Sequence, residues 1–570
     1  MKGKSFIARL AAIVMAFAVV LPITACNMGK GADTDQMLEV MMLDAGYGVQ
    51  WGKDMLDAFK QEDWVKAKYP NIQTKFTSDG NMSTLTTKID AGQRANTVDL
   101  FFGTGMAKYE GANASGYEMF ADLTDVVYNA TVPGEDVTVR NKMDKSYVDS
   151  LWYYEKGQDS NTPNVPFKAY AFPWASGMDG ILYNAEYLEI LGEEVPLTTN
   201  QFLEVCEKAS SERLLDYNLE ANGNYAVLTD SSGRYWYYVM PTWWAQYEGI
   251  DGYYDFCNGV YRESPSDPGR ISGEIFKQKG KLYALQTLEN ILKYDKGYVY
   301  TKHTGLQFMQ SQANFIRGNG VFYSNGDWFA KEMEATVEEI ENRGQKAYDI
   351  RMMKTPIVSE IIEKTPSIPD EETLRAVIRA IDYGCEDAQM MKQTVEFKGS
   401  ELVFGVTQAD YEKILSARGT IHALGSSHRA LVPSYAQGKE IAFDFLRFMA
   451  TDKAQEIYMK ATGGGSLPFE YNVRVKNPSL YGQLLPIEKD RLSFLYDSVY
   501  ETKVMPDSSA FPLAKWGEMS SFKYLSTTAI VSEFLSKGST VTAQTIFDED
   551  IKYYVTAGEF DKCRTLAGLT

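Results

Sequence analysis

The sequence predicts an α/β protein with a mostly parallel sheet and more than one domain. Its 570 residues exceed the roughly 100–200 residues of one domain. Hydrophobic residues make up 44% and charged residues 23%, which is typical of a soluble globular protein and excludes a mainly disordered chain. The N-terminal part also shows the order strand, helix, strand, helix, strand, which predicts parallel strands covered by helices.

These elements are predicted from the spacing of apolar residues. A short, mainly apolar run over 37–43 suits a buried strand, and helical spacing follows it until Tyr69-Pro70-Asn71. The expected strands are 37–43, 72–77 and 98–102, and the expected helices are 53–68 and 81–91. Ligands of parallel sheets bind beyond the carboxyl ends of the strands. The loops after the three strands are therefore expected to share one rim: 45–51, 79–81 and 103–106.

The first 25 residues have the pattern of an export signal. Three basic residues precede an uncharged run from Leu10 to Ala25, which is shorter than a membrane span of about 20 residues. Thr24-Ala25-Cys26 resembles the lipobox of bacterial lipoproteins, which implies cleavage before Cys26 and its diacylation. Two acyl chains would hold the protein at the extracytoplasmic face of the cell membrane, with residues 26–35 as a tether. An ordinary signal peptide followed by an incidental cysteine is the alternative.

Charge and cysteine content exclude several classes of partner. The formal net charge is −19, so nucleic acid and anionic headgroups would repel the protein. The four cysteines after Cys26 are widely spaced and form no C-x-x-C motif, so they indicate neither a zinc site nor a dithiol redox centre. We expect these four to be buried free thiols: Cys206, Cys257, Cys385 and Cys563.

Catalytic signatures are mostly absent. The chain has three histidines and no H-E-x-x-H, G-x-S-x-G, Walker A or G-x-G-x-x-G motif. We therefore predict no catalytic residue, metal or cofactor. Pairs of carboxylates suited to glycoside hydrolysis remain open, because 76 acidic residues offer many pairs and a sequence does not give their separation.

The most informative segment is 312–328. It predicts a helix ended by Gly318-Asn319-Gly320, a short strand, and a tight turn that exposes Asp327 and Trp328 just before a second helix. The positive end of that helix would point at whatever lies over the turn. The segment resembles the carbohydrate-binding solute-binding proteins of ABC transporters, the family that includes maltose-binding proteins. The resemblance implies that the Trp of the Asn325-Gly326-Asp327-Trp328 turn stacks on a sugar ring.

Other stretches resemble the same family in the same order. The first crossing between lobes in that family is resembled by residues 170–174 and 180–184, and the helix that follows it by 200–204. The return crossing and its helix are resembled by 431–433 and 441–449, and the Gly-rich turn by 463–468. The resemblance implies a two-lobed periplasmic-binding-protein-like fold with three interlobe crossings. One lobe would take 36–173 and 357–465, and the other 174–356 and 466–570. A charged stretch at 357–420 looks like an insertion of helices and one strand, Leu402–Val406.

Sugar binding needs flat apolar surfaces for the ring and planar polar groups for the hydroxyls. The flat apolar surfaces would come from aromatic residues of the first loop, the first crossing and the aromatic run at 234–244. The planar polar groups would come from acidic or amide side chains of the loops. The candidate ligand-binding residues are Trp328, Asp327, Tyr47, Trp51, Trp174, Asp79, Asn81, Asp179, Tyr235, Trp243 and Trp244.

The resemblance implies a monomeric, lipid-anchored receptor that is not an enzyme. It would close around an oligosaccharide and deliver it to the permease of an ABC transporter. Two alternatives stay open at this point: a surface-anchored glycoside hydrolase, and a receptor of the same fold that binds peptides.

Overall fold

The computed structural model describes residues 36–92, 97–106, 109–110, 113, 118–144, 147–148, 151, 168–211, 225–264, 266–300, 303–423, 427–497, 499, 503–506 and 528–566. The export signal, Cys26 and the tether lie outside these residues. Within the described ranges, no helix is both long and apolar enough to span a membrane.

A five-stranded sheet organises the first lobe, in the order β2-β1-β3-β12-β4. β1 pairs in parallel with β2 and β3, as the sequence predicts, whereas β12 runs antiparallel to β3 and β4. The strands are β1 (Met37–Leu43), β2 (Gln73–Asp79), β3 (Leu100–Thr104), β4 (Ala171–Pro173) and β12 (His428–Leu431). The carboxyl ends of β1, β2 and β3 therefore lie at one edge, which confirms the shared rim.

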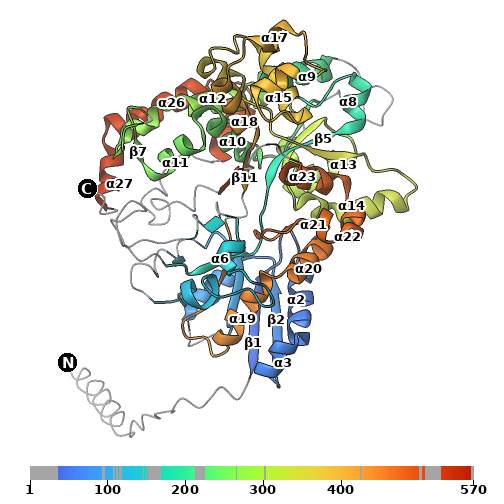
Figure 1. Ribbon diagram of the computed structural model, residues 1–570, viewed down its shortest axis with the longest axis vertical. Helices are drawn as coiled ribbons and strands as arrows, with labels where there is room; N and C mark the ends of the chain where they lie inside the picture. Colours follow the sequence, from blue (N-terminus) through green and yellow to red (C-terminus); the bar gives the residue numbers. More distant parts are fainter. Residues whose placement is uncertain are drawn as a thin grey trace, which may run out of the picture.

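Amphipathic helices cover this sheet. Figure 1 shows α2 and α19 beside β1 and β2 in one lobe, and their apolar sides join the strands in a single core. The expected helix over 53–68 is divided in two by Glu62, whose extended backbone ends one helix and begins the next. The elements are α2 (Gln50–Gln61), α3 (Asp63–Lys68), α4 (Met82–Ala91), η3 (Thr124–Tyr128), α6 (Val139–Lys142), α19 (Lys439–Met449) and α20 (Asp452–Thr462).

The second lobe surrounds a four-stranded sheet in the order β10-β5-β9-β6. β5 is antiparallel to β10 and β9, and β6 is parallel to β9. The elements are β5 (Asp179–Asn184), α8 (Ala185–Leu191), α9 (Thr199–Ser211), β6 (Val227–Leu228), α10 (Trp236–Glu248), α11 (Ile250–Asn258), β7 (Val260–Tyr261), β8 (Arg270–Ile271), η4 (Gly273–Lys277), α12 (Lys279–Leu292), η5 (Tyr294–Lys296), η6 (His303–Gly305), α13 (Phe308–Ile316), β9 (Phe322–Gly326), α14 (Phe329–Asn342) and β10 (Ile350–Met353).

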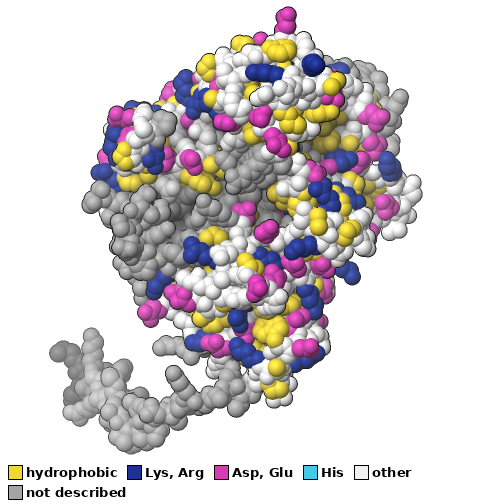
Figure 2. Space-filling view, in the orientation of Figure 1, with side chains coloured by type: hydrophobic (Ala, Val, Ile, Leu, Met, Phe, Trp, Pro, Cys, Tyr) yellow, Lys and Arg dark blue, Asp and Glu magenta, His cyan; other side chains and the backbone are white. Residues whose placement is uncertain are grey.

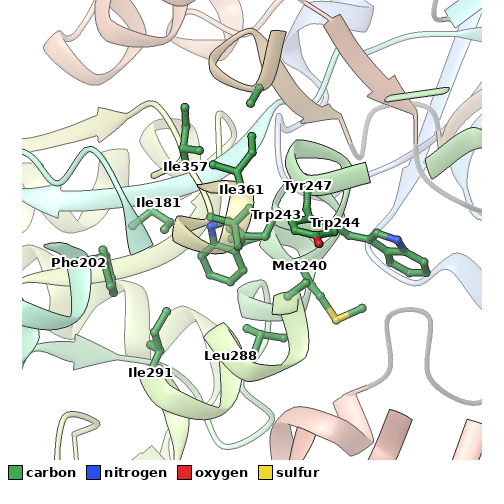
Figure 3. Packing of buried hydrophobic residues seen from close by; sticks show 14 of the residues in the cluster. Ile181, Phe202, Met240, Trp243, Trp244, Tyr247, Leu288, Ile291, Ile357 and Ile361 are labelled. Carbon is green, nitrogen blue, oxygen red and sulfur yellow. The ribbon is translucent and has the colours of Figure 1, made fainter. Parts of the chain in front are cut away.

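The stretch 357–420 belongs to the second lobe, so its assignment to the first lobe is wrong. Ile357 and Ile361 pack in one core with Phe202 and Trp243 (Figure 3). Apart from Asp410 and Arg418, which are buried, the charged side chains that suggested an insertion are exposed or partly exposed, and an apolar side of each helix joins this core. The elements are η7 (Ser359–Lys364), α15 (Glu371–Tyr383), α16 (Ala388–Gln393), α17 (Glu401–Phe404) and α18 (Gln408–Arg418). The strand expected at 402–406 is also wrong, because most of it is the short helix α17.

Three crossings join the lobes, as the family resemblance implies. The first lies between β4 and β5, the second between β11 (Thr420–Ala423) and β12, and the third follows α20. Backbone contacts hold them side by side: Met178 bridges to Ala423, and the Ser176 N–H donates to the Ser466 carbonyl at 2.8 Å. The lobe borders differ slightly from the expectation, since Trp174, Leu467 and Phe469 still pack in the first lobe's core.

After the third crossing the chain returns to the second lobe. The helix α23 packs against β10, and β13 pairs in parallel with β11. The elements are α21 (Val473–Lys476), α22 (Pro478–Gln483), α23 (Pro486–Tyr496), β13 (Lys503–Pro506), α25 (Thr528–Leu535), α26 (Ala543–Asp550), η10 (Ile551–Thr556) and α27 (Glu559–Leu566). The prediction of buried free thiols is confirmed for Cys206 and Cys385. Cys257 is buried as expected, and the side chain of Cys563 lies outside the described part.

Candidate functional site

Four aromatic residues from both lobes meet where the lobes touch, and we name them the interlobe aromatic group: Tyr47, Trp174, Tyr235 and Trp328. Tyr47 lies in the loop after β1, and its ring meets Trp174 and Trp328 edge-on, with centroids 6.3 Å apart in both pairs. Trp328 and Tyr235 come from the second lobe and lie 5.5 Å apart. The predicted candidates from the first loop, the first crossing and the Trp328 turn are therefore brought together.

The turn that carries Trp328 is built by its own residues. The Asn325 side chain accepts from the Gly326 N–H at 2.8 Å, and the Asp327 N–H donates to the Met178 carbonyl at 2.9 Å. A Cβ at Gly326 would lie 2.2 Å from the Trp328 ring, so only glycine lets the indole lie against this turn. The turn is thus fixed to the first crossing, and its shape determines where the ring points.

Asp327 and Trp328 are buried, although the turn sequence predicts that they are exposed. Trp328 is 5% exposed and Asp327 is 1% exposed, because the first lobe covers the turn. The Tyr47 hydroxyl donates to Asp327 Oδ1 across the lobe boundary. The elements around the turn are as predicted, but the contact between the lobes buries the two side chains.

Tyr235 has a strained backbone. Its φ of 73° places it in the left-handed region, which a bulky residue rarely adopts, and it directly precedes α10. The loop before it is held by Asp230, whose Oδ1 accepts from the backbone N–H of Ser232 and of Arg234. Such strain is typically stored at functional sites, and here it directs Tyr235 toward Trp328.

A buried charge cluster lies beside the aromatic group: Asp327, Glu488 and Arg491. Arg491 Nε lies 3.0 Å from Glu488 Oε2 and 3.8 Å from Asp327 Oδ2. Its terminal nitrogens donate to Ser466 Oγ at 2.9 Å and to the Gly464 carbonyl at 2.6 Å, both in the third crossing. Arg491 therefore links the third crossing to the turn that carries Trp328.

Burial dominates the electrostatics of this cluster. Desolvation raises the pKa of Glu488 to about 7, although Arg491 opposes the shift. Desolvation also raises the pKa of Asp327, and here Arg491 and the Tyr47 hydrogen bond act in the opposite direction. Two carboxylates thus share one guanidinium, so the cluster is neutral when the pair holds one proton and carries −1 when it holds none.

Asp179 also lies at the lobe boundary. It starts β5, directly after the first crossing, and its carboxylate is 2.9 Å from His422 Nδ1, just before the second crossing. On the opposite side of the first crossing, the Tyr147 hydroxyl donates to the Ser176 carbonyl. These contacts place polar groups along the crossings themselves.

A cavity of about 520 Å³ opens beside the charge cluster. All three crossings contribute to its wall, together with Arg491, residues of the first lobe around Tyr147, and residues of α23. Binding sites for small molecules are usually cavities of about 300–1,000 Å³ that combine aromatic surfaces with a few polar groups. Its polar and aromatic lining includes Asn141, Tyr147, Ser176, Tyr471, Asn472 and Tyr496.

Trp243 and Trp244 lie elsewhere, which corrects their selection as ligand contacts. Both belong to α10 and are packed in the core of the second lobe (Figure 3). Their indole N–H groups are already paired, with the Pro356 carbonyl at 3.1 Å and with Gln278 at 2.8 Å. Most rings of the aromatic run at 234–244 pack in the core of the second lobe, and Tyr235, near its start, lies at the lobe boundary.

Three further candidates, Trp51, Asp79 and Asn81, lie outside the interlobe aromatic group. Trp51 is fully buried in the first lobe and stacks on Trp174 with centroids 5.4 Å apart, so it backs the aromatic group. Asn81 lies at the predicted rim, where its side chain caps α4, and Asp79 accepts from the Asn81 N–H at 2.8 Å. Both residues therefore shape the second loop.

Sequence reasoning missed Arg491, Glu488, His422, His428 and Tyr458. His428 meets the Trp174 ring edge-on at 4.5 Å, and Tyr458 contacts Tyr47 and Trp51. A weak signal existed for the histidines, because two of the three in the chain flank the second crossing. Arg491 has no comparable signal, since its partner Asp327 is 164 positions away along the chain.

No protein-family model matches the sequence, and no curated protein shows significant sequence similarity. Solved structures do match. A chitin oligosaccharide binding protein has a TM-score of 0.51 and 16% identity over 93% of this chain and 99% of its own. The ABC substrate-binding protein Lmo0181 from Listeria monocytogenes, solved with cycloalternan, has a TM-score of 0.52 and 13% identity over 94% and 99%. Maltose-bound T. maritima MalE3 has a TM-score of 0.52 and 13% identity over 93% and 99%.

The chain therefore has the two-lobed α/β fold of solute-binding proteins. The match covers nearly the whole length of this chain and nearly the whole length of each of these structures. At 13–16% identity the likeness concerns the fold, and function has to be argued from the site.

Proposed function

We propose that this protein captures an oligosaccharide between its two lobes and delivers it to the permease of an ABC transporter. The observation that carries this proposal is the interlobe aromatic group, which joins Trp328 to a buried carboxylate on the same turn at the boundary of two lobes. Three solved structures of the same fold are named for, or hold, oligosaccharides, which supports a ligand of that class.

The residues at the boundary supply both kinds of contact that a sugar needs. Trp328, Tyr235, Tyr47 and Trp174 offer flat rings for the C–H faces, and Asp327 and Asp179 offer carboxylate oxygens for hydroxyls. Because Trp328 is almost fully covered, a ligand would enter when the lobes separate and would be enclosed when they close. Asp79 and Asn81, at the edge of the second loop, would contact only a longer chain.

Titration calorimetry with a series of oligosaccharides tests the proposal. A binding sugar should also raise the melting temperature by mass action. Release of new reducing ends during incubation would instead favour a glycoside hydrolase, and binding of peptides without any sugar would favour a peptide receptor. The absence of any heat or thermal shift across neutral and charged oligosaccharides would contradict sugar binding.

The lipid anchor is part of the proposal, and its support is the sequence around Cys26. Cys26→Ala should move the protein from the membrane fraction to the soluble fraction, since both acyl chains would be lost. Cys206→Ala is the matched control, because it removes a buried thiol of the second lobe and leaves the anchor intact. Equal membrane association of wild type and Cys26→Ala would contradict the anchor.

A further inference from the structure

We propose that the interlobe site selects oligosaccharides without negative charge, and that Asp327 is the residue that sets this selectivity. The proposal rests on the function proposed above and adds to it the chemical class of the ligand. Uronic-acid or sulfated sugars would be rejected, while neutral or amine-bearing sugars of the same length and linkage would bind.

The cations near the lobe boundary are already paired with acidic side chains. Arg491 lies between Glu488 and Asp327, as described above. Arg429, buried in β12, lies 3.4 Å from Glu110, and Lys142 at the cavity wall lies within 2.7 Å of both Glu135 and Asp452. Each of these three positive charges thus has an acidic partner among the described residues, so its charge is largely compensated before an anionic sugar arrives, although Arg429 Nη1 makes no hydrogen bond.

A buried hydrogen-bond acceptor remains at the lobe boundary. Asp327 Oδ1 accepts from Tyr47, but Asp327 Oδ2 makes no hydrogen bond among the described residues: Arg491 Nε lies 3.8 Å away, and the side chain is 1% exposed. A carboxylate oxygen left in this way is costly unless a donor arrives. A sugar hydroxyl or ammonium group supplies that donor, whereas a uronate carboxylate supplies only further acceptors.

Protonation does not reverse this preference. Asp327, Glu488 and Arg491 together are neutral with one proton on the carboxylate pair and carry −1 without it. Besides Arg491, the groups that face the pair are Tyr47, Tyr147, Tyr458, Asp179 and Asp490, and none of these adds positive charge. Like charges brought together in a buried interface are strongly unfavourable, so an anionic ligand meets repulsion or, at best, no attraction.

A matched ligand set tests the inference with the full-length chain. The set holds cellotetraose and maltotetraose, each as the neutral sugar, as the C6-oxidised uronate form and as the 2-amino form. We expect the neutral or amine form of the binding sugar to bind at least about tenfold more tightly than its uronate form. Asp327→Asn should bring the ratio of the two dissociation constants, uronate over neutral or amine form, closer to one. Asp327→Asn combined with Glu488→Gln leaves Arg491 without a carboxylate and should favour the uronate.

Glu341→Gln is the control for charge, because it removes one acidic group from the exposed end of α14 and should leave the ratio unchanged. The melting temperature of each variant shows whether it is folded, and the single variant remains informative if the double variant is unstable. Equal or tighter binding of the uronate by wild type would overturn this inference alone. A ratio that Asp327→Asn leaves unchanged would also overturn it. Failure of these six sugars and of the whole oligosaccharide series used above would overturn the proposed function together with this inference.

Discussion

At the scale of residues, the structure separates two kinds of buried tryptophan. Trp328 and Trp243 are similarly buried, but Trp328 is covered by a residue of the other lobe, whereas Trp243 is enclosed by its own lobe and bound to the Pro356 carbonyl. Opening of the lobes would uncover the first ring and leave the second in place. Burial alone therefore does not distinguish a ligand-binding ring from a core ring.

Trp328→Ala should weaken sugar binding by about 2 kcal/mol or more, a hot-spot effect equal to roughly thirtyfold in affinity. The same change should cost less stability than Trp243→Ala, for which we expect about 3–5 kcal/mol, because Trp243 leaves a cavity inside one lobe. Calorimetry and urea unfolding of both variants check this. Intact affinity in Trp328→Ala would place the ligand elsewhere.

Glu488 should make stability depend on pH. Its pKa in the folded protein is raised to about 7 from an ordinary 4.5, so the folded state binds the proton more tightly than the unfolded chain. The resulting stabilisation is complete below about pH 4.5 and is lost as the pH rises through about 7. Glu488→Gln, which resembles the protonated form, should therefore gain stability relative to wild type between pH 5 and 8, on the order of 1–3 kcal/mol.

Urea unfolding at several pH values measures this difference, with Glu338→Gln as a control at an exposed position of α14. A constant difference between wild type and Glu488→Gln across that range would contradict a raised pKa. If the free energy of unfolding of Glu338→Gln also came to differ from that of wild type as the pH rises, the effect would be due to overall charge.

At the scale of elements, the sequence predicts what local periodicity determines. Apart from the break at Glu62, the strands and helices of 37–104 are found within a few residues of their predicted bounds, because each has a clear apolar pattern. Leu402–Val406 fails for the same reason, since a run of five apolar residues fits a strand or a short helix equally well. The lobe to which 357–420 belongs depends on long-range packing, which no local pattern contains.

The pairing of Asp327 with Arg491 shows the same limit within the site. The turn at 325–328 could be predicted because its residues are adjacent in the sequence. Arg491 comes from a helix beyond the third crossing, and only the path of the chain through both lobes brings it to Asp327. Likewise, the burial of Trp328 depends on how the lobes meet.

Because α15 contributes to the core of the second lobe, Ile378→Ala should destabilise that lobe as a whole. The side chain is fully buried in the shared core, so we expect a loss of about 2–5 kcal/mol. Val395→Ala is the control, since Val395 is 82% exposed and its truncation should change stability by less than about 0.5 kcal/mol. Amide exchange should accelerate in β5 and β9 as well as in α15. Acceleration confined to 357–420 would indicate an independent insertion.

At the scale of the whole molecule, two lobes with separate cores are connected by three adjacent crossings. Acidic and basic side chains are interspersed over the face in Figure 2. The contacts between the lobes include the Tyr47–Asp327 hydrogen bond and the edge of Trp328, and these are also the proposed ligand contacts. Closure of the lobes and ligand binding therefore use the same side chains. A bound ligand should replace some of the direct contacts between the lobes or add to them.

Small-angle X-ray scattering can detect this relation. The structure has its lobes in contact, and a ligand reaches Trp328 only after they separate, so the ligand-free protein should sample wider conformations than this one. We expect its radius of gyration to exceed the value calculated from the structure and to fall toward that value when a binding sugar is added. Tyr47→Phe removes one interlobe hydrogen bond and should increase the ligand-free radius further. A radius that equals the calculated value with and without sugar would mean that the lobes stay closed, and the ligand would then have to enter by another route.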